Sequence, residues 1–262
     1  ADPQRCSTDG PLAGRRRFRG GEGWYNRRLF HHAEPSMSTL LALDTSTEAC
    51  SVALLHEGRA LSHYEVIPRL HAQRLLPMVR DLLDEAGVAL SAVDAIAFGR
   101  GPGAFTGVRI AIGVVQGLAF ALQRPVLAVS DLAILAQRAY REQGAERVAA
   151  AIDARMDEVY WGCYQLQQGE MRLAGSEAVL PPERVAVPWD AAAADWFGAG
   201  TGWGYVERMP QRPAALDASL LPHAEDLLSL AGFAWARGEG VEAEQALPVY
   251  LRDNVATPKK AP

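Results

Sequence analysis

An aspartate and two hydroxyl residues, Asp44, Thr45 and Ser46, follow a short apolar run and could bind a metal ion or a phosphate. A carboxylate at the end of a strand can hold Mg²⁺ through water, with both hydroxyl groups near a phosphate. The same side chains can instead close a tight turn by hydrogen bonding to nearby backbone N–H groups. Turn chemistry favours the structural interpretation, and the ligand interpretation stays open.

A glycine-rich run at 99–107 is the second candidate, and it contains Gly101, Gly103 and Thr106. Glycines allow backbone conformations that a Cβ would forbid. Thr106 can cap the helix that follows, and the free N–H groups at the start of a helix suit an anion. Together with the Asp-Thr-Ser run, these residues form a candidate weak site for a nucleotide phosphate.

The aspartate pattern occurs twice, because Ala-Ile-Asp at 151–153 matches Ala-Leu-Asp at 42–44. A polar turn and a strand-like run follow each copy. Arg155 stands close enough in sequence to neutralise the second aspartate, Asp153. A repeat offset by about half of the core chain predicts a duplicated fold.

A second glycine turn, FGAGTGWG at 197–204, could also hold a phosphate through its backbone N–H groups. It lacks a Walker lysine and a complete GxGxxG pattern. Trp203 can instead fill the space beside the turn, so we expect a structural role.

Metal and nucleophilic chemistry have weak support in the sequence. A metal site would need ligands at helical spacing, whereas His71 is followed four residues later by Leu75. No GxSxG nucleophile motif is present. Cys50 and Cys163 lie in strand-like apolar runs, where a buried thiol is inert. We therefore expect no metal site and no catalytic residue.

The elements that must position these residues follow from apolar periodicity and turn signals. The pattern predicts strands at 40–43, 51–55, 60–67, 95–98 and 125–129, and helices at 72–86, 107–122, 132–143 and 224–237. With the repeat, this indicates a duplicated α/β fold. The layout resembles that of the actin, sugar-kinase and heat-shock-70 proteins, which implies two ribonuclease-H-like lobes around a cleft. The second lobe here is degenerate because few clear helices precede its last one.

The helices at 72–86 and 107–122 carry more apolar surface than one small lobe can cover. The sheet and the other lobe could cover it, but two glycines four residues apart and a wide apolar stripe favour a partner interface. Two such helices from each of two molecules would form a four-helix bundle. On this hypothesis, Gly113→Leu or Met78→Glu should abolish pairing and leave the lobe folded. The predicted interface residues are Leu75, Leu76, Met78, Val79, Leu82, Arg109, Ile112, Gly113, Gln116, Gly117 and Phe120.

Composition is that of an ordinary globular chain, with 262 residues, 49% hydrophobic and 22% charged. A net charge of −5 argues against broad nucleic-acid binding by the whole surface. The three cysteines are too few and scattered for a disulfide framework. We expect no apolar run that reaches the roughly 18 residues of a membrane span. The predicted units are a non-native extension at 1–36, a first lobe at 37–146, a second lobe at 147–245, and a terminal segment with a loose tail at 246–262.

The run GPGAFTGVR resembles the GPGSFTGLR signature of the TsaB (YeaZ) family, from which Ala104 and Val108 are mild departures. The resemblance extends from Met37 to about Arg252. It includes LLALDTSTEACSVALL near the start, AIDARMDEVYWGCY in the middle and PVYLR near the end. Four motifs in the right order are much more specific than any one of them.

The resemblance implies a non-catalytic partner that binds and activates a TsaD-type subunit. That subunit would transfer a threonylcarbamoyl group to N6 of the adenosine beside the tRNA anticodon. The family also implies a TsaE-type ATPase as partner, a homodimer when alone and tRNA contact only through the complex. The lack of a long apolar run makes no membrane contact and a cytoplasmic location the default expectation. No cofactor of its own is expected, with ATP or ADP and Mg²⁺ in the assembled complex. The alternatives are a free-standing ATPase or kinase-like enzyme, a peptidase, or a homodimeric scaffold.

Overall fold

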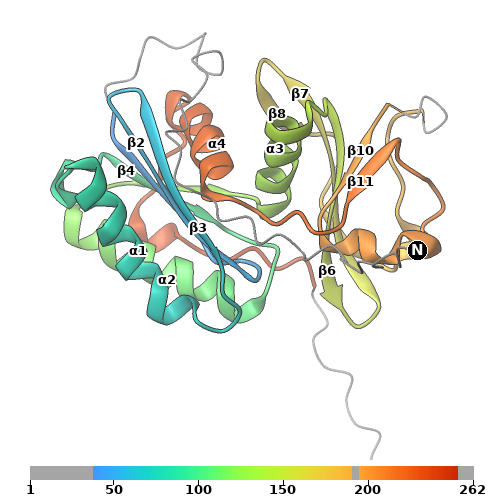
Figure 1. Cartoon of the computed structure of the whole chain (residues 1–262), viewed down its shortest axis with the longest axis horizontal. Helices are drawn as coiled ribbons and strands as arrows, with labels where there is room; N and C mark the ends of the chain where they lie inside the picture. Colours follow the sequence, from blue (N-terminus) through green and yellow to red (C-terminus); the bar gives the residue numbers. More distant parts are fainter. Residues whose placement is uncertain (1–37, 191–194, 253–262) are drawn as a thin grey trace, which may run out of the picture.

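Two β-sheets with helices between and beside them form the protein in the computed structural model, which describes residues 38–190 and 195–252 (Figure 1). The predicted extension at 1–36, with Cys6, and the tail from 253 lie outside the described residues.

The first sheet has the strand order β3-β2-β1-β4-β5. Its strands are β1 (Leu40–Asp44), β2 (Ala49–His56), β3 (Arg59–Val66), β4 (Ala95–Gly99) and β5 (Val126–Val129). The first three strands pair antiparallel as a meander, and β4 and β5 add in parallel beside β1. Short turns allow antiparallel neighbours, whereas the parallel strands need the helical crossovers that the sequence predicts.

The second sheet repeats this order as β8-β7-β6-β10-β11, with the same sequence of antiparallel and parallel pairs. Its strands are β6 (Arg147–Arg155), β7 (Glu158–Gln167), β8 (Glu170–Leu173), β10 (Phe197–Ala199) and β11 (Ala215–Asp217), with β9 (Ala178–Leu180) paired to β7. Asp44 ends β1 and Asp153 lies near the end of β6. The predicted duplication is confirmed.

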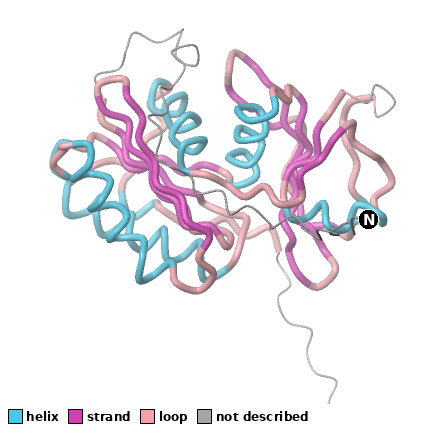
Figure 2. Tube along the Cα trace, viewed as in Figure 1, coloured by secondary structure: helices cyan, strands magenta, loops and turns pink. Residues whose placement is uncertain are grey.

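Four α-helices accompany the two sheets in the described part of the chain (Figures 1 and 2). They are α1 (His71–Ala86), α2 (Phe105–Leu122), α3 (Asp131–Gln143) and α4 (Ala224–Ala236). In the chain order of the second lobe, two short 3-10 segments take the places that α1 and α2 have in the first lobe. They are η3 (Pro182–Arg184) and η5 (Thr201–Arg208). The second lobe is therefore degenerate, as predicted.

The two lobes exchange helices across their junction. Helix α3 follows the first sheet in sequence but packs on the second, whereas α4 packs on β1 of the first sheet. These two helices also contact each other between the sheets (Figure 1). The terminal segment then returns to the first lobe, where Val249 N donates to Arg100 O at 2.8 Å. The predicted units 37–146 and 147–245 are thus joined by exchanged elements.

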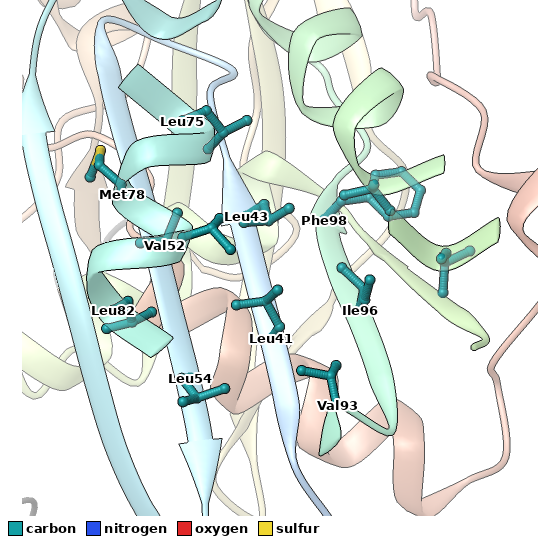
Figure 3. Packing of buried hydrophobic residues seen from close by; sticks show 14 of the residues in the cluster. Leu41, Leu43, Val52, Leu54, Leu75, Met78, Leu82, Val93, Ile96 and Phe98 are labelled. Carbon is teal, nitrogen blue, oxygen red and sulfur yellow. The ribbon is translucent and has the colours of Figure 1, made fainter. Parts of the chain in front are cut away.

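One core fills the space between the first sheet and the helices α1 and α2 (Figure 3). Leucine and other apolar side chains of β1, β2 and β4 meet Leu75, Met78 and Leu82 of α1, and all of these helix residues are fully buried. Their spacing of three and four residues is that of one helix face. The apolar stripe of α1 therefore packs on its own sheet.

This burial corrects the predicted partner interface. Five of its members are core residues and present no surface to another molecule: Leu75, Met78, Val79, Leu82 and Ile112. Met78→Glu would place a carboxylate in this apolar core, so we expect it to destabilise the lobe and not to leave it folded. The sequence shows that these positions are apolar, but it does not show which surface covers them.

Two expectations about α2 also need correction. Thr106 does not cap the helix, because the N-cap residue is Ala104 and Thr106 is exposed within the first turn. The helix has 18 residues with a mean hydropathy of 1.7, so by length and composition alone it could cross a membrane, contrary to the expected absence of such a run. A helix that contributes to the core of a lobe passes the same test, and one side of α2 packs there.

Candidate functional site

The glycine turn before α2 lies against the turn that follows β1, which brings most of the predicted phosphate-site residues together. Ala104 N donates to Ser46 O at 2.7 Å, and Thr45 Oγ1 donates to Gly107 O at 2.7 Å. A Cβ on Gly103 or on Gly107 would overlap a carbonyl oxygen of this neighbouring turn. The glycines are therefore required by close packing of the chain on itself.

Asp44 closes its own turn. Its carboxylate accepts hydrogen bonds from Ser46 N at 2.7 Å and from Ser46 Oγ at 3.1 Å. Asp44, Thr45 and Ser46 are all buried, so the hydrogen bonds occur out of contact with water. This geometry agrees with the turn interpretation of these three residues.

Asp131, at the start of α3, is a buried carboxyl group that the sequence interpretation did not include in this site. One of its oxygens accepts a hydrogen bond from Gly101 N, and Asp131 N donates to Gly101 O at 3.1 Å. Gly99 has no room for a Cβ because the same carboxyl group lies beside it. A carboxylate thus occupies the position where the turn would offer its N–H group to an anion.

Burial raises the pKa of Asp44, and it raises the pKa of Asp131 well above its ordinary value. The charge of Asp44 raises the pKa of Asp131 further, since two adjacent carboxylates repel each other. The remaining oxygen of Asp131 has no hydrogen-bond partner while the group is ionised. A proton retained on Asp131 and donated to Asp44 resolves both the repulsion and the missing partner.

The second lobe fills the corresponding region differently. Asp153 accepts hydrogen bonds from Arg155 N at 2.8 Å and from Arg155 Nη1 at 3.0 Å, so the predicted neutralisation is confirmed. Trp203 is buried, and its Nε1 donates to Ala149 O at 2.9 Å. The indole lies directly against Gly198, so the second glycine turn has the structural role that we expected.

Both cysteines of the described residues are buried, which makes their thiols poor nucleophiles at neutral pH. Burial raises the pKa of Cys50 and that of Cys163 to about 12, so both thiols stay protonated. His71 is buried and lies 3.2 Å from the carbonyl oxygen of Ala49 through its Nε2. Across residues 38–190 and 195–252, no three His, Cys, Asp or Glu side chains gather in a way that could hold a metal ion.

The outer side of α1 and α2 remains exposed, and six predicted interface residues contribute to it. Large apolar side chains stand out from both helices, since Leu76 is 49% exposed and Phe120 is 73% exposed. No atom lies within 4 Å of a Cβ placed on Gly113 or on Gly117. We call these six residues the outer helix face: Leu76, Arg109, Gly113, Gln116, Gly117 and Phe120.

Sequence reasoning missed three exposed residues beside this face. Phe105 is 63% exposed, Leu247 is 61% exposed and Tyr250 is 48% exposed. Phe105 could have been found, because it precedes Arg109 by one helical turn. The other two belong to the terminal segment and reach α2 only because the chain returns to the first lobe.

Comparison with known proteins gives concordant matches. A family model described as "TsaD: tRNA N6-adenosine threonylcarbamoyltransferase" matches residues 63–260. The Escherichia coli "tRNA threonylcarbamoyladenosine biosynthesis protein TsaB" is 48% identical over 224 residues, which is 84% of this chain and 97% of that protein. The Haemophilus influenzae protein of the same name is 43% identical over 86% of this chain and 97% of its own length.

A solved structure agrees with these relatives. The protein described as "YeaZ from Pseudomonas aeruginosa" is 99% identical, with a TM-score of 0.81, and the match covers 82% of this chain and 100% of that one. Two relatives with more than 40% identity and this structure all match most of the described residues. The chain belongs to the TsaB (YeaZ) family.

Proposed function

We propose that this chain is a non-catalytic subunit that binds and activates a TsaD-type subunit through the outer helix face. The activated subunit would transfer a threonylcarbamoyl group to N6 of the adenosine adjacent to the anticodon of tRNA. Relatives with this fold are named for threonylcarbamoyladenosine biosynthesis. The observation that carries the proposal is the exposed side of α1 and α2.

The outer helix face has the features of a helix-packing surface. Burial of Leu76 and Phe120 against a partner would contribute about 1.5–3 kcal/mol for each side chain. Gly113 and Gly117 leave the backbone of α2 open, so a partner helix can approach closely. Two helices from each subunit would then form a four-helix contact.

The interior of the chain supports an accessory role over an enzymatic one. The glycine turn of the first lobe is closed by Ser46 and Asp131, and the turn of the second lobe is filled by Trp203. Both described thiols are buried and protonated. The residue types that could do chemistry are thus engaged in holding the fold together.

The same proposal extends to the remaining partners. ATP or ADP with Mg²⁺ would act in the assembled complex, with a TsaE-type ATPase as a further subunit. A net charge of −5 favours tRNA contact through the other subunits. The chain would work in the cytoplasm, apart from membranes, and pair with itself in the absence of its partner.

The test compares matched substitutions of exposed apolar residues. Leu76→Glu and Phe120→Glu should reduce binding to the TsaD-type subunit by at least ~30-fold, because each places a charge in a packed contact. Leu173→Glu, on β8 of the second lobe, is the control and should bind as the wild type does. Circular dichroism confirms folding, and calorimetry gives the affinity. Wild-type affinity in folded Leu76→Glu and Phe120→Glu variants would refute the proposal.

Activity provides a second readout. Threonylcarbamoyl transfer to tRNA by the mixed subunits should fall in parallel with the affinity of each variant. Titration of the isolated chain with ATP and Mg²⁺ separates this function from that of a free-standing ATPase. Tight binding with turnover by the chain alone would favour the enzyme.

A further inference from the structure

Arg109 lies beside two exposed aromatic rings at the start of α2. Its guanidinium carbon is 3.3 Å from the centre of the Phe105 ring and 5.0 Å from the centre of the Tyr250 ring. The two ring centres are 6.0 Å apart. A cation held over aromatic faces is attracted by their quadrupoles, and its plane is fixed by stacking.

Among the described residues, no acidic side chain pairs with Arg109. Its one described hydrogen bond runs from Nη1 to Phe105 O at 3.3 Å, and within the described residues it forms no ion pair. Many other described arginines form ion pairs, as Arg74 does with Glu65 and Arg141 does with Asp226. Arg109 is therefore a fixed cation with donor groups free for another molecule.

The terminal segment holds the second ring in place. Val249 N donates to Arg100 O at 2.8 Å, and Gln116 Nε2 donates to Ala246 O at 3.0 Å. These bonds fasten the segment along α2, so Tyr250 reaches the helix start. The cation is consequently positioned before any partner arrives, which lowers the entropy cost of binding.

Exposed apolar side chains form a partial rim beside this cation. Phe105 and Tyr250, both substantially exposed, contact it, and Gly113 lies one helical turn beyond Arg109. A rim of this kind excludes water from a central polar contact, which strengthens a charge-assisted hydrogen bond. The geometry suits the planar carboxylate of an acidic side chain.

We infer that Arg109 binds an Asp or Glu side chain of the TsaD-type subunit, and that Phe105 and Tyr250 hold the guanidinium in position for it. The inference rests on the proposed function and names the chemistry of the partner at one point of the contact. The guanidinium would use its unused N–H groups in a two-pronged contact with the carboxylate.

The test uses the full-length chain and its TsaD-type subunit. Arg109→Glu should weaken binding by about 30-fold or more, and Arg109→Lys should recover only part of the loss, because lysine lacks the planar fork. Arg59→Glu, an exposed arginine at the start of β3, makes the same charge change away from α2 and should bind within about twofold of the wild type. The dependence of affinity on salt should also be weaker for Arg109→Gln than for the wild type.

A charge-reversal scan then identifies the partner group. Exposed Asp and Glu residues of the TsaD-type subunit are changed one at a time to Lys and mixed with the Arg109→Glu chain. One such reversal should restore at least about tenfold of the lost affinity. If none restores binding, the partner group is not a carboxylate and the inference fails.

Two other outcomes overturn the inference and leave the proposed function separately testable. If Arg109→Glu binds with wild-type affinity and Leu76→Glu does not, the outer helix face remains the interface, but Arg109 does not contact a carboxylate there. If Arg109→Glu only dissociates a homodimer, measured by light scattering, and binds the TsaD-type subunit normally, the cation serves a second copy. Full affinity of both variants would refute the proposed function itself.

Discussion

The two lobes share one strand order but differ in what covers the outer face of each sheet. The first lobe carries α1 and α2, whose outer side stays exposed and apolar. In the described part of the second lobe, 3-10 segments and a tryptophan cluster cover the sheet, with Trp161 and Trp196 each within 6 Å of Trp203 between ring centres. The comparison teaches that one strand order can carry either an exposed apolar helical face or a closed core.

The largest expected effect is a loss of stability when a charge is placed in the core of the first lobe. Met78→Glu should lower the free energy of unfolding by roughly 5 kcal/mol, because it buries a carboxyl group without a partner. Leu76→Glu, two residues earlier on the exposed side, should change it by less than about 1 kcal/mol. Urea unfolding followed by circular dichroism measures both. Equal stability of the two variants would contradict the assignment of inner and outer sides.

Loss of its central tryptophan should destabilise the second lobe. Trp203→Ala removes a buried ring and the hydrogen bond to Ala149 O, so we expect a loss of about 3–5 kcal/mol. The remaining folded protein should bind the TsaD-type subunit with unchanged affinity, since the outer helix face is untouched. Calorimetry below the unfolding transition checks this, and weakened binding by folded protein would place Trp203 in the interface.

Two glycines of α2 should give smaller changes in stability, of opposite sign, when each is replaced by alanine. Gly107→Ala should cost about 1–3 kcal/mol, because its Cβ would overlap the carbonyl oxygen of Thr45. Gly113→Ala should stabilise the lobe by up to about 1 kcal/mol, because the site is open and alanine favours a helix. Thermal unfolding distinguishes the two signs. A stabilising Gly107→Ala would mean that the turn is less closely packed than described.

The last prediction concerns the pH dependence of stability, through the carboxyl pair of the first lobe. Because the pKa of Asp131 is raised in the folded protein, the native state keeps a proton that the unfolded state loses as pH rises above about 4. Stability should therefore fall with rising pH until the folded pKa is reached, by at most about 1.4 kcal/mol per pH unit for one proton. Asp131→Asn keeps a donor toward Asp44 and should remove this slope. Unfolding free energies measured from pH 4 to 8 test it, and identical slopes would show that Asp131 is ionised.

Much of the fold was accessible from local patterns in the sequence. The spacing of apolar residues predicts α1, and Gly87 ends it in a left-handed conformation, as expected of a C-terminal glycine. The match of Asp44 with Asp153 predicts the duplication that the two strand orders confirm. Such signals succeed because helix and strand periods are set by the backbone alone.

The candidate site was only partly predictable. Apolar periodicity marks Leu75, Met78 and Leu82 but is silent on whether a sheet or a partner covers them. Helix α2 is apolar on nearly every side, so its pattern gives no direction at all. Asp131 was absent from the predicted turn because it comes 30 residues after Gly101.

The sequence by itself determined the order of elements, the internal repeat and the membership of the TsaB family, since each depends on residue types at short spacing. The tertiary structure decided which side of α1 and α2 faces outward, that Asp131 meets Asp44, and that Tyr250 reaches Arg109. Those contacts join residues far apart in the chain. They exist only because the packed sheets and the returning terminal segment bring them together, and no local period encodes that meeting.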